Sequence, residues 1–170
     1  MDLAKTIRDV PNFPKDGIIF KDITTLLKDP VALKESIAQM KKLFLNCGIT
    51  KVCGAESRGF IFGAPLAIEL GAGFVPIRKP GKLPAETISQ EYTLEYGKDK
   101  IEMHVDAIEK GEKVLFVDDL LATGGTAAAC AKLLTQMGAD IVGFLFLVEL
   151  EFLKGRELLS GFTVKSVIKY

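Results

Sequence analysis

Two nearly continuous apolar runs constrain the fold of this chain more than any other feature. Residues 113–117 and residues 141–150 carry apolar side chains at most successive positions, without the polar alternation of a half-exposed strand. A strand with that pattern is buried on both faces, as in a parallel sheet. Apolar residues at helical spacing occupy the stretch between the two runs. The sequence therefore predicts an α/β fold in which helices flank a mostly parallel central sheet.

The remaining elements follow from shorter patterns. Asp29 can cap a helix that begins at Pro30 and that Gly48 would end, because aspartate suits the cap and proline the first helical position. Pro65 is expected near the first turn of a further helix. Strands are predicted at residues 51–55, 74–77 and 162–168, and helices at residues 60–70 and 127–137.

Two segments differ from the alternating core. Residues 1–28 form an arm that Pro11, Pro14 and Gly17 interrupt. Residues 79–100 are polar and too long for a routine connection, so they predict a flexible lid loop, with a mobile hairpin near residues 87–94. No repeat or linker divides the chain, and residues 1–170 are therefore expected to form a single domain.

Composition excludes several classes of protein. The 22 basic and 22 acidic residues give no net charge, whereas a general nucleic-acid binder normally carries a basic excess. No apolar run reaches the roughly 18 residues of a membrane span, and no secretory signal is visible at the start. Cys47, Cys53 and Cys130 match neither a disulfide nor a zinc pattern. These features favour a cytoplasmic protein with reduced thiols.

Residues 114–126 carry the clearest chemistry. An apolar strand leads into Asp118 and Asp119, then into a turn of small residues and the start of a helix. The free N–H groups at a helix start bind phosphate, and glycines allow its close approach. The two carboxylates could accept hydrogen bonds from ribose hydroxyls or face a Mg²⁺ ion. The pattern predicts a ribose 5-phosphate site; the alternative is a capped helix beside solvated aspartates.

Other nucleotide-binding motifs do not fit. The chain has no GxxxxGK[ST] sequence, and Gly71 and Gly73 precede an expected strand instead of following one. His104 lies outside every motif and is expected to be structural. Among these patterns, residues 114–126 are therefore the only phosphate-binding motif that the sequence supports.

The run 114–126 resembles the phosphoribosyl-pyrophosphate signature of the type I phosphoribosyltransferases. Residues 13–23, 56–60, 78–84 and 94–97 are similar to further segments of the adenine-specific members of that family, so the resemblance extends from about residue 11 to residue 159. It implies the type I phosphoribosyltransferase fold, with an N-terminal hood over the base and a mobile lid. It also implies transfer of phosphoribosyl from phosphoribosyl pyrophosphate to adenine, which gives AMP and pyrophosphate. Mg²⁺ would accompany the substrate, and the family is usually a homodimer.

The resemblance also implies roles for individual residues. Glu95 would exchange a proton with the purine, and Arg58 would assist the transfer. Ile19, Phe20 and Lys21 would contact adenine. The pyrophosphate would be bound by Glu56, Ser57, Arg58, Arg78, Lys79 and Lys82. The ribose 5-phosphate would be bound by Asp118, Asp119, Ala122, Thr123, Gly124, Gly125 and Thr126, with no fixed protein metal site beyond a possible Mg²⁺ contact at the two aspartates.

Two other functions remain compatible with the phosphate motif. The first is a non-catalytic sensor of phosphoribosyl pyrophosphate, as in some purine-responsive repressors. Such a sensor would be expected to carry an added DNA-binding domain and a basic face. The second is a transferase of the same type that acts on guanine, xanthine or orotate. The hood residues decide between bases, and they are harder to interpret than the phosphate motif.

Overall fold

The structure is a computed structural model that describes residues 1–94 and 96–170. The chain divides into two compact units, residues 1–39 and residues 40–170. Each unit is described by itself below.

A parallel five-stranded sheet forms the centre of the larger unit. The strand order is β4-β3-β7-β8-β9, and every neighbouring pair is parallel. The predicted parallel α/β sheet is confirmed. The strands are β3 (Lys51–Ala55), β4 (Gly73–Ile77), β7 (Lys113–Leu121), β8 (Asp140–Glu149) and β9 (Val164–Lys169).

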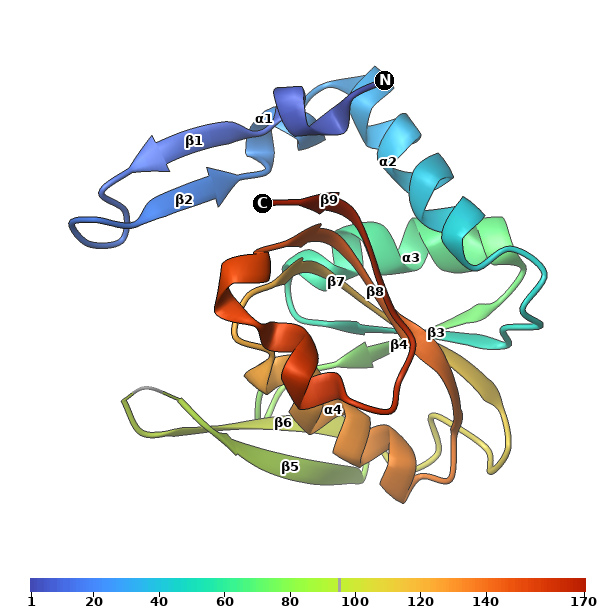
Figure 1. Cartoon of the computed structure of the whole chain (residues 1–170). Helices are drawn as coiled ribbons and strands as arrows, with labels where there is room; N and C mark the ends of the chain where they lie inside the picture. Colours follow the sequence, from blue (N-terminus) through green and yellow to red (C-terminus); the bar gives the residue numbers. More distant parts are fainter. Residues whose placement is uncertain (95) are drawn as a thin grey trace. The chain divides into compact units, whose positions relative to one another are not determined.

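The strand order reverses between β3 and β7, and this reversal places the helices. The chain leaves β3 through α3 (Arg58–Leu70) toward β4, and leaves β7 through α4 (Gly125–Gln136) in the opposite direction toward β8. Because such crossovers are right-handed, the two helices cover opposite faces of the sheet, as Figure 1 shows. Both helices nevertheless begin at the carboxyl edge of the sheet, where open α/β sheets bind ligands.

Aromatic rings fill the core between the sheet and α4. Phe116 on β7 is fully buried, and its ring centroid lies 5.3 Å from that of Phe144 and 6.1 Å from that of Phe146 on β8. Val117 is buried on the same strand. The apolar runs that predicted the sheet are therefore enclosed on both faces.

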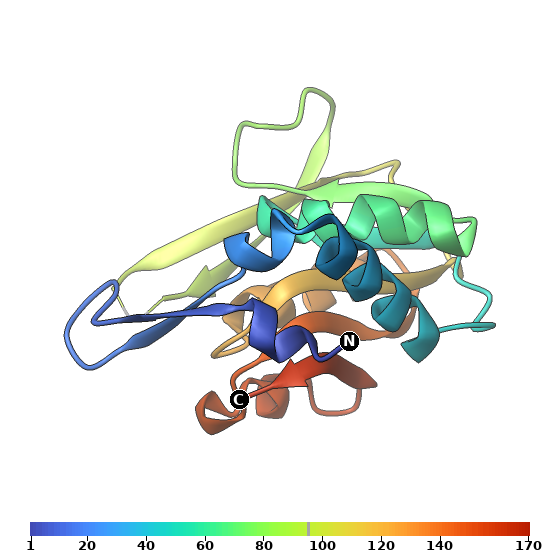
Figure 2. The same cartoon turned by 90° about the horizontal axis from the view of Figure 1, so that it is seen from above.

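An antiparallel hairpin follows the sheet strand β4. It consists of β5 (Thr87–Thr93) and β6 (Lys98–His104), and the loop before it projects from the unit in Figure 2. The base of the hairpin is fixed, because Ile101 and Met103 are buried in the core. The hairpin therefore continues past residue 100, where the sequence analysis had ended the flexible segment.

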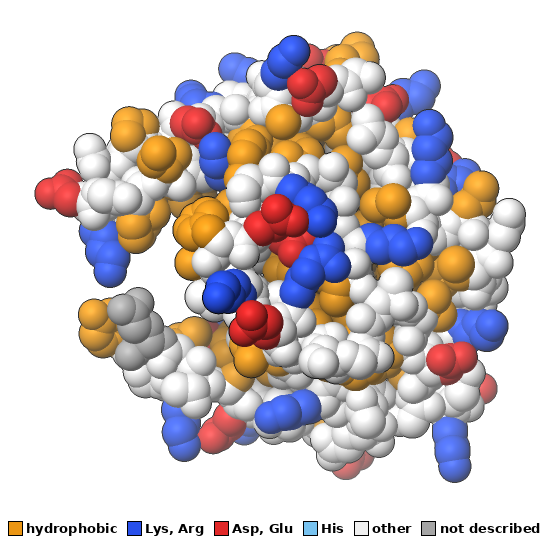
Figure 3. All heavy atoms as spheres, viewed as in Figure 1, with side chains coloured by type: hydrophobic (Ala, Val, Ile, Leu, Met, Phe, Trp, Pro, Cys, Tyr) orange, Lys and Arg blue, Asp and Glu red, His pale blue; other side chains and the backbone are white. Residues whose placement is uncertain are grey.

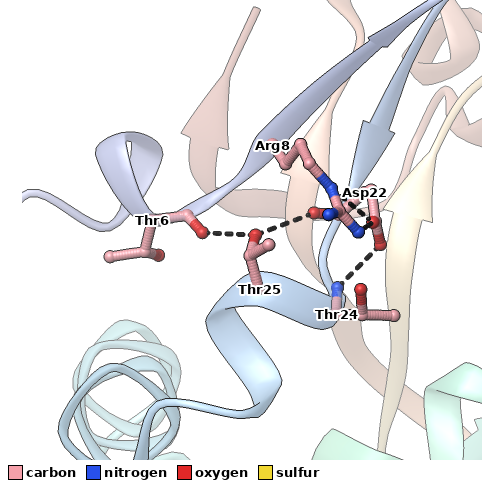
Figure 4. Close-up of polar contacts among 5 residues, drawn as sticks. All are labelled: Thr6, Arg8, Asp22, Thr24 and Thr25. Carbon is pink, nitrogen blue, oxygen red and sulfur yellow. Dashed lines mark hydrogen bonds and ion pairs between the residues drawn. The ribbon is translucent and has the colours of Figure 1, made fainter.

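The smaller unit contains a hairpin where the sequence predicted only an interrupted arm. Its hairpin strands pair in register, with Arg8 opposite Asp22, and these two side chains form an ion pair (Figure 4). The hydrogen bonds from Arg8 and Thr24 lower the pKa of Asp22 to about 2. The elements are the 3₁₀ helix η1 (Leu3–Thr6), β1 (Arg8–Pro11), β2 (Ile19–Asp22), α1 (Thr24–Leu27) and most of α2 (Pro30–Leu43).

Two expected helix boundaries differ from the structure. The Asp29 carboxylate caps α2 as predicted, accepting the Val31 N–H at 2.8 Å, but α2 ends at Leu43 and not at Gly48. Helix α3 begins at Arg58, so Pro65 lies in its interior and not in its first turn. A proline there removes one helical hydrogen bond, the one that the Ile61 carbonyl would otherwise accept.

Two further observations concern the helices and the surface charges. Within residues 1–94 and 96–170, no helix is long and apolar enough to cross a membrane. Acidic and basic side chains are interspersed on the face shown in Figure 3, in keeping with the equal numbers of the two kinds.

The aromatic core predicts a large loss of stability on truncation. Phe116→Ala should lower the free energy of unfolding by about 3–5 kcal/mol, because it leaves a cavity beside the rings of Phe144 and Phe146. Ile68→Ala, at a position 81% exposed on α3, should change it by less than about 0.5 kcal/mol. Urea unfolding followed by circular dichroism measures both. Equal losses for the two variants would contradict this account of the core.

Candidate active site

A cavity of about 250 Å³ opens at the carboxyl edge of the sheet, between the ends of β3 and β7. Its position is the point where the strand order reverses. Two helix starts and the end of β7 contribute to the lining. The polar side chains and loop residues that line it are Glu56, Ser57, Arg58, Lys79, Tyr92, Asp118, Asp119, Thr123, Gly124, Gly125 and Thr126, beside the apolar Ala55, Ile77, Ile101, Leu120, Leu121, Ala122, Ala127 and Phe146.

Asp118 and Asp119, the acid pair of the site, belong to strand β7 itself, which continues to Leu121. The sequence analysis had ended the strand at residue 117. Asp119 is 4% exposed, and Asp118 accepts the Asp119 N–H at 2.8 Å. Continued pairing of β7 with β8 through Leu121 therefore fixes the backbone of both acids.

The loop after the acid pair leads to the start of α4. Gly124 caps this helix in a left-handed conformation, with φ of +87°. A Cβ atom at Gly124 would lie 2.5 Å from the carbonyl oxygen of Gly155, so a side chain is excluded by space as well as by conformation. The N–H groups in the first turn of a helix have no helical partners, and Gly125, Thr126 and Ala127 of this turn line the cavity.

The start of α3 forms the opposite wall. Arg58 is the first residue of this helix, and it forms an ion pair with Asp119 in which Nε lies 2.9 Å from the carboxylate. Gly59 follows, and a Cβ atom there would lie 3.0 Å from Asp118 Oδ1. The absence of a side chain at Gly59 thus lets α3 approach the acid pair. The Glu56–Ser57 peptide bond before the helix is cis.

The electrostatics of the pair are asymmetric. Burial raises the pKa of Asp118 well above its ordinary value, and the neighbouring Asp119 charge raises it further. Arg58 opposes this effect on Asp118 only in part, and its direct partner is Asp119. Asp118 is therefore the acid whose charge is costly, and a ligand that donates hydrogen bonds would stabilise its ionised form.

A second charge cluster lies on the hairpin side. Lys79 Nζ donates to the Tyr92 hydroxyl at 3.0 Å and forms an ion pair with Asp99. Desolvation opposes the charge of Lys79, but its hydrogen bonds to Asp99 and Tyr92, together with the charges of these groups, outweigh desolvation and raise the pKa of Lys79. Glu56 accepts the backbone N–H of Lys79 at 2.7 Å and the Nε of Arg78 at 3.2 Å. The cluster joins β5 and β6 to the end of β4.

The structure brings together most of the predicted residues, but not all. All seven residues predicted to bind ribose 5-phosphate line the cavity, as do Glu56, Ser57, Arg58 and Lys79. Arg78 and Lys82 do not, because the Arg78 side chain turns to Glu56 and to the Lys82 carbonyl. Ile19, Phe20 and Lys21 belong to the smaller unit. Glu95 lies outside the described residues.

Sequence reasoning missed two residues of the cluster, Tyr92 and Asp99. The alternation along β5 contains the signal for the first, because Ile88, Gln90 and Tyr92 are the less exposed positions. Asp99 had no such signal. No group of three or more possible metal ligands occurs in the part of the chain that the structure describes.

Comparison with known proteins gives this site a family. The model of the phosphoribosyl transferase domain matches residues 22–168. An adenine phosphoribosyltransferase of Acetivibrio thermocellus is 60% identical over 171 residues and covers 100% of both chains. The crystal structure of adenine phosphoribosyltransferase from Thermoanaerobacter pseudethanolicus superposes with a TM-score of 0.96 at 52% identity, covering 99% of this chain and 98% of the other.

A third relative was solved with ligands. The Saccharomyces cerevisiae adenine phosphoribosyltransferase, 41% identical with a TM-score of 0.92, covers 97% of this chain and 96% of its own. It is complexed with D-2,5-dideoxy-2,5-imino-altritol 1,6-bisphosphate and adenine. The chain therefore belongs to the phosphoribosyltransferase family, the pentosyl-transferring enzymes. Within that family it is a member of the adenine phosphoribosyltransferases, which act in purine salvage.

The raised pKa of Asp118 makes a prediction about stability. Below its ordinary value of 3.8 the group is protonated in both states, so burial costs nothing; as pH rises, only the unfolded chain ionises freely and stability is lost. Asp118→Asn should therefore raise the melting temperature at about pH 7, and the gain should shrink toward about pH 4. Calorimetry at both pH values measures this.

Asp119→Asn is the matched control, because it removes the acceptor of Arg58 from a buried position. It should lower the melting temperature at neutral pH. A gain for Asp119→Asn, or a loss for Asp118→Asn, would contradict the assignment of the costly charge.

Proposed function

We propose that the cavity binds 5-phosphoribosyl 1-pyrophosphate and transfers its phosphoribosyl group to adenine, giving AMP and pyrophosphate. One observation carries this proposal: the starts of two helices meet at one cavity with an acid pair beside them. A helix start favours anions, whereas carboxylates repel anions and accept hydrogen bonds from hydroxyl groups. A sugar with a phosphate group at each end matches that order of charges.

The proposed orientation follows from the two helix starts. The 5-phosphate lies on residues 122–126 at α4, where backbone N–H groups and the Thr123 and Thr126 hydroxyls can donate. The ribose hydroxyls donate to Asp118 and Asp119. The pyrophosphate lies at the start of α3, with Arg58 and Lys79 near its oxygens. The ligand of the yeast relative, a 1,6-bisphosphate, is consistent with two anion sites.

Arg58 and Lys79 have acidic partners in the structure, and this bears on their role. Each would exchange a carboxylate partner, Asp119 or Asp99, for a pyrophosphate oxygen or share its hydrogen bonds with both. Positive charge at the leaving group stabilises the developing negative charge. Arg78 and Lys82, which lie outside the lining, would contribute to pyrophosphate binding only after a change of side-chain position.

The reaction also requires exclusion of water and a proton donor or acceptor. Bond cleavage at the ribose carbon develops cationic character that water would capture, so the site has to close. We assign closure to the part of the 79–100 segment beyond the buried base of the hairpin. Glu95, between β5 and β6, is the proposed acid or base for the purine ring, on the basis of the family resemblance.

Mg²⁺ is the proposed cofactor, and the residues present fit one mode of binding. Asp119 is paired with Arg58, and Asp118 accepts a backbone N–H, so the described residues offer no enclosing set of ligands. Mg²⁺ commonly binds through substrate phosphates plus one or two carboxylates. It would thus arrive with the pyrophosphate and offset part of its charge.

Ile19, Phe20 and Lys21 are the proposed adenine contacts. Phe20 packs edge to face on Phe13 with ring centroids 5.2 Å apart, and Lys21 pairs with Asp9 at 2.6 Å. These contacts hold β2 so that its backbone could pair with the edge of a base. A homodimer and a cytoplasmic location complete the proposal; the three free cysteines are compatible with a reducing compartment.

The ribose assignment is tested by removing both charges from the acid pair. The combined substitution Asp118→Asn and Asp119→Asn should lower kcat/KM for AMP formation by about 10²–10⁴-fold, the equivalent of two charge-assisted hydrogen bonds. Asp140→Asn, at the opposite end of β8, is the control and should retain activity. Near-normal turnover of the double variant would remove the ribose role.

Glu95 is tested by an isosteric change. Glu95→Gln should lower kcat by about 10²–10⁴-fold, the usual contribution of a positioned acid or base, with little change in phosphoribosyl pyrophosphate binding. Glu91→Gln alters a neighbouring exposed glutamate that lies 3.9 Å from Lys98, and it should leave kcat unchanged. An unchanged kcat for Glu95→Gln would eliminate the proton-transfer assignment.

A further inference from the structure

A partly buried ion pair outside the cavity lies near residues 122–125, the proposed phosphate loop. Glu149, at the carboxyl end of β8, is only 3% exposed. Its carboxylate accepts Nε and Nη2 of Arg156 at 2.5 and 2.8 Å, and the Ser166 hydroxyl at 2.5 Å. Burial alone would raise the pKa of Glu149, but these hydrogen bonds outweigh it and lower the pKa below its ordinary range. Neither Glu149 nor Arg156 lines the cavity.

Arg156 connects three separate elements. It lies in the 3₁₀ helix η3 (Gly155–Leu159). Nε and Nη2 of its guanidinium group bind Glu149 on β8, and Nη1 donates to the carbonyl of Val164 on β9 at 2.7 Å. The four residues before Gly155 are exposed and bury no side chain. The position of Gly155 therefore depends on what holds η3, which is Arg156 together with the buried Leu159.

Gly155 in turn lies directly against the phosphate loop. Its carbonyl oxygen occupies the space next to Gly124, where a Cβ atom would come within 2.5 Å of it. A Cβ atom at Gly155 would clash with the carbonyl oxygen of Ala122 and lie 2.9 Å from the Leu121 side chain. Because the backbone of Gly155 packs against the backbone at both Ala122 and Gly124, the loop has no room to move toward η3.

We propose that the Glu149–Arg156 ion pair is a positioning element of the sugar-phosphate site. It holds the backbone of Gly155 in place against residues 122–125. The N–H groups at the start of α4 thereby stay in the geometry that binds phosphate. Neither residue touches the substrate. The inference rests on the proposed function of the loop, and it adds two residues to which no motif pointed.

The test compares matched ion pairs at the two edges of the same sheet. Glu149→Gln replaces one acceptor oxygen with a donor that opposes Arg156, and Arg156→Lys keeps the charge but removes the fork. The controls are Glu112→Gln and Lys51→Arg, in the 3.1 Å pair at the amino edge. Binding of ribose 5-phosphate to the full chain is measured by titration calorimetry below the melting temperature, and KM is measured for both substrates.

The expected result is selective. Glu149→Gln and Arg156→Lys should weaken ribose 5-phosphate binding and raise KM for phosphoribosyl pyrophosphate by about 10-fold or more, as a displaced binding loop does. KM for adenine should change by less than about two-fold, and the controls should bind as the unaltered chain does.

Three results would overturn the inference. The pair is only structural if Glu149→Gln and Arg156→Lys bind ribose 5-phosphate normally despite a lowered melting temperature. The effect is general destabilisation if the controls lose affinity to the same extent. If the unaltered chain does not bind ribose 5-phosphate, the proposed function of the loop fails first, and the inference fails with it.

Discussion

The contact between Gly59 at the start of α3 and Asp118 on β7 sets the dimensions of the cavity. A side chain at residue 59 would meet the Asp118 carboxylate and the Val117 carbonyl, and would push the helix away from the sheet. With glycine there, the start of α3 lies beside the acid pair and opposite the start of α4. The reversal of strand order between β3 and β7 makes this possible, because it sends the two helices to opposite faces from one edge.

The same contact carries an electrostatic cost. Two carboxylates lie at the end of a buried strand, and only Asp119 has a cationic partner within hydrogen-bond distance. The raised pKa of Asp118 is the consequence of burial and of its neighbour. Strain of this kind collects at functional sites, where a ligand supplies the missing partner. In the proposed function the ribose hydroxyls and Mg²⁺ have that role, so binding would relieve a cost that folding leaves in place.

Much of the fold was predictable from the sequence, because apolar runs and glycine turns report local structure directly. The five sheet strands and the residues at the start of α4 follow from such patterns. Pro65 was placed too near the helix start, because α3 begins at Arg58, two residues before the predicted start. Arg78 was assigned to the pyrophosphate from the family resemblance, but in the structure its side chain is bonded to Glu56. The Glu149–Arg156 pair joins residues whose importance arises from contacts with a distant loop, and local patterns do not report these.

The most direct measurement of the central claim is a competition between bases. The protein is incubated with phosphoribosyl pyrophosphate, Mg²⁺ and an equal mixture of adenine, guanine, hypoxanthine and xanthine, and the nucleotides formed are separated. The account predicts AMP as the product. A different nucleotide would retain the phosphate site but contradict the adenine assignment to Ile19, Phe20 and Lys21. Binding of phosphoribosyl pyrophosphate without formation of any nucleotide would contradict the proposed transfer itself.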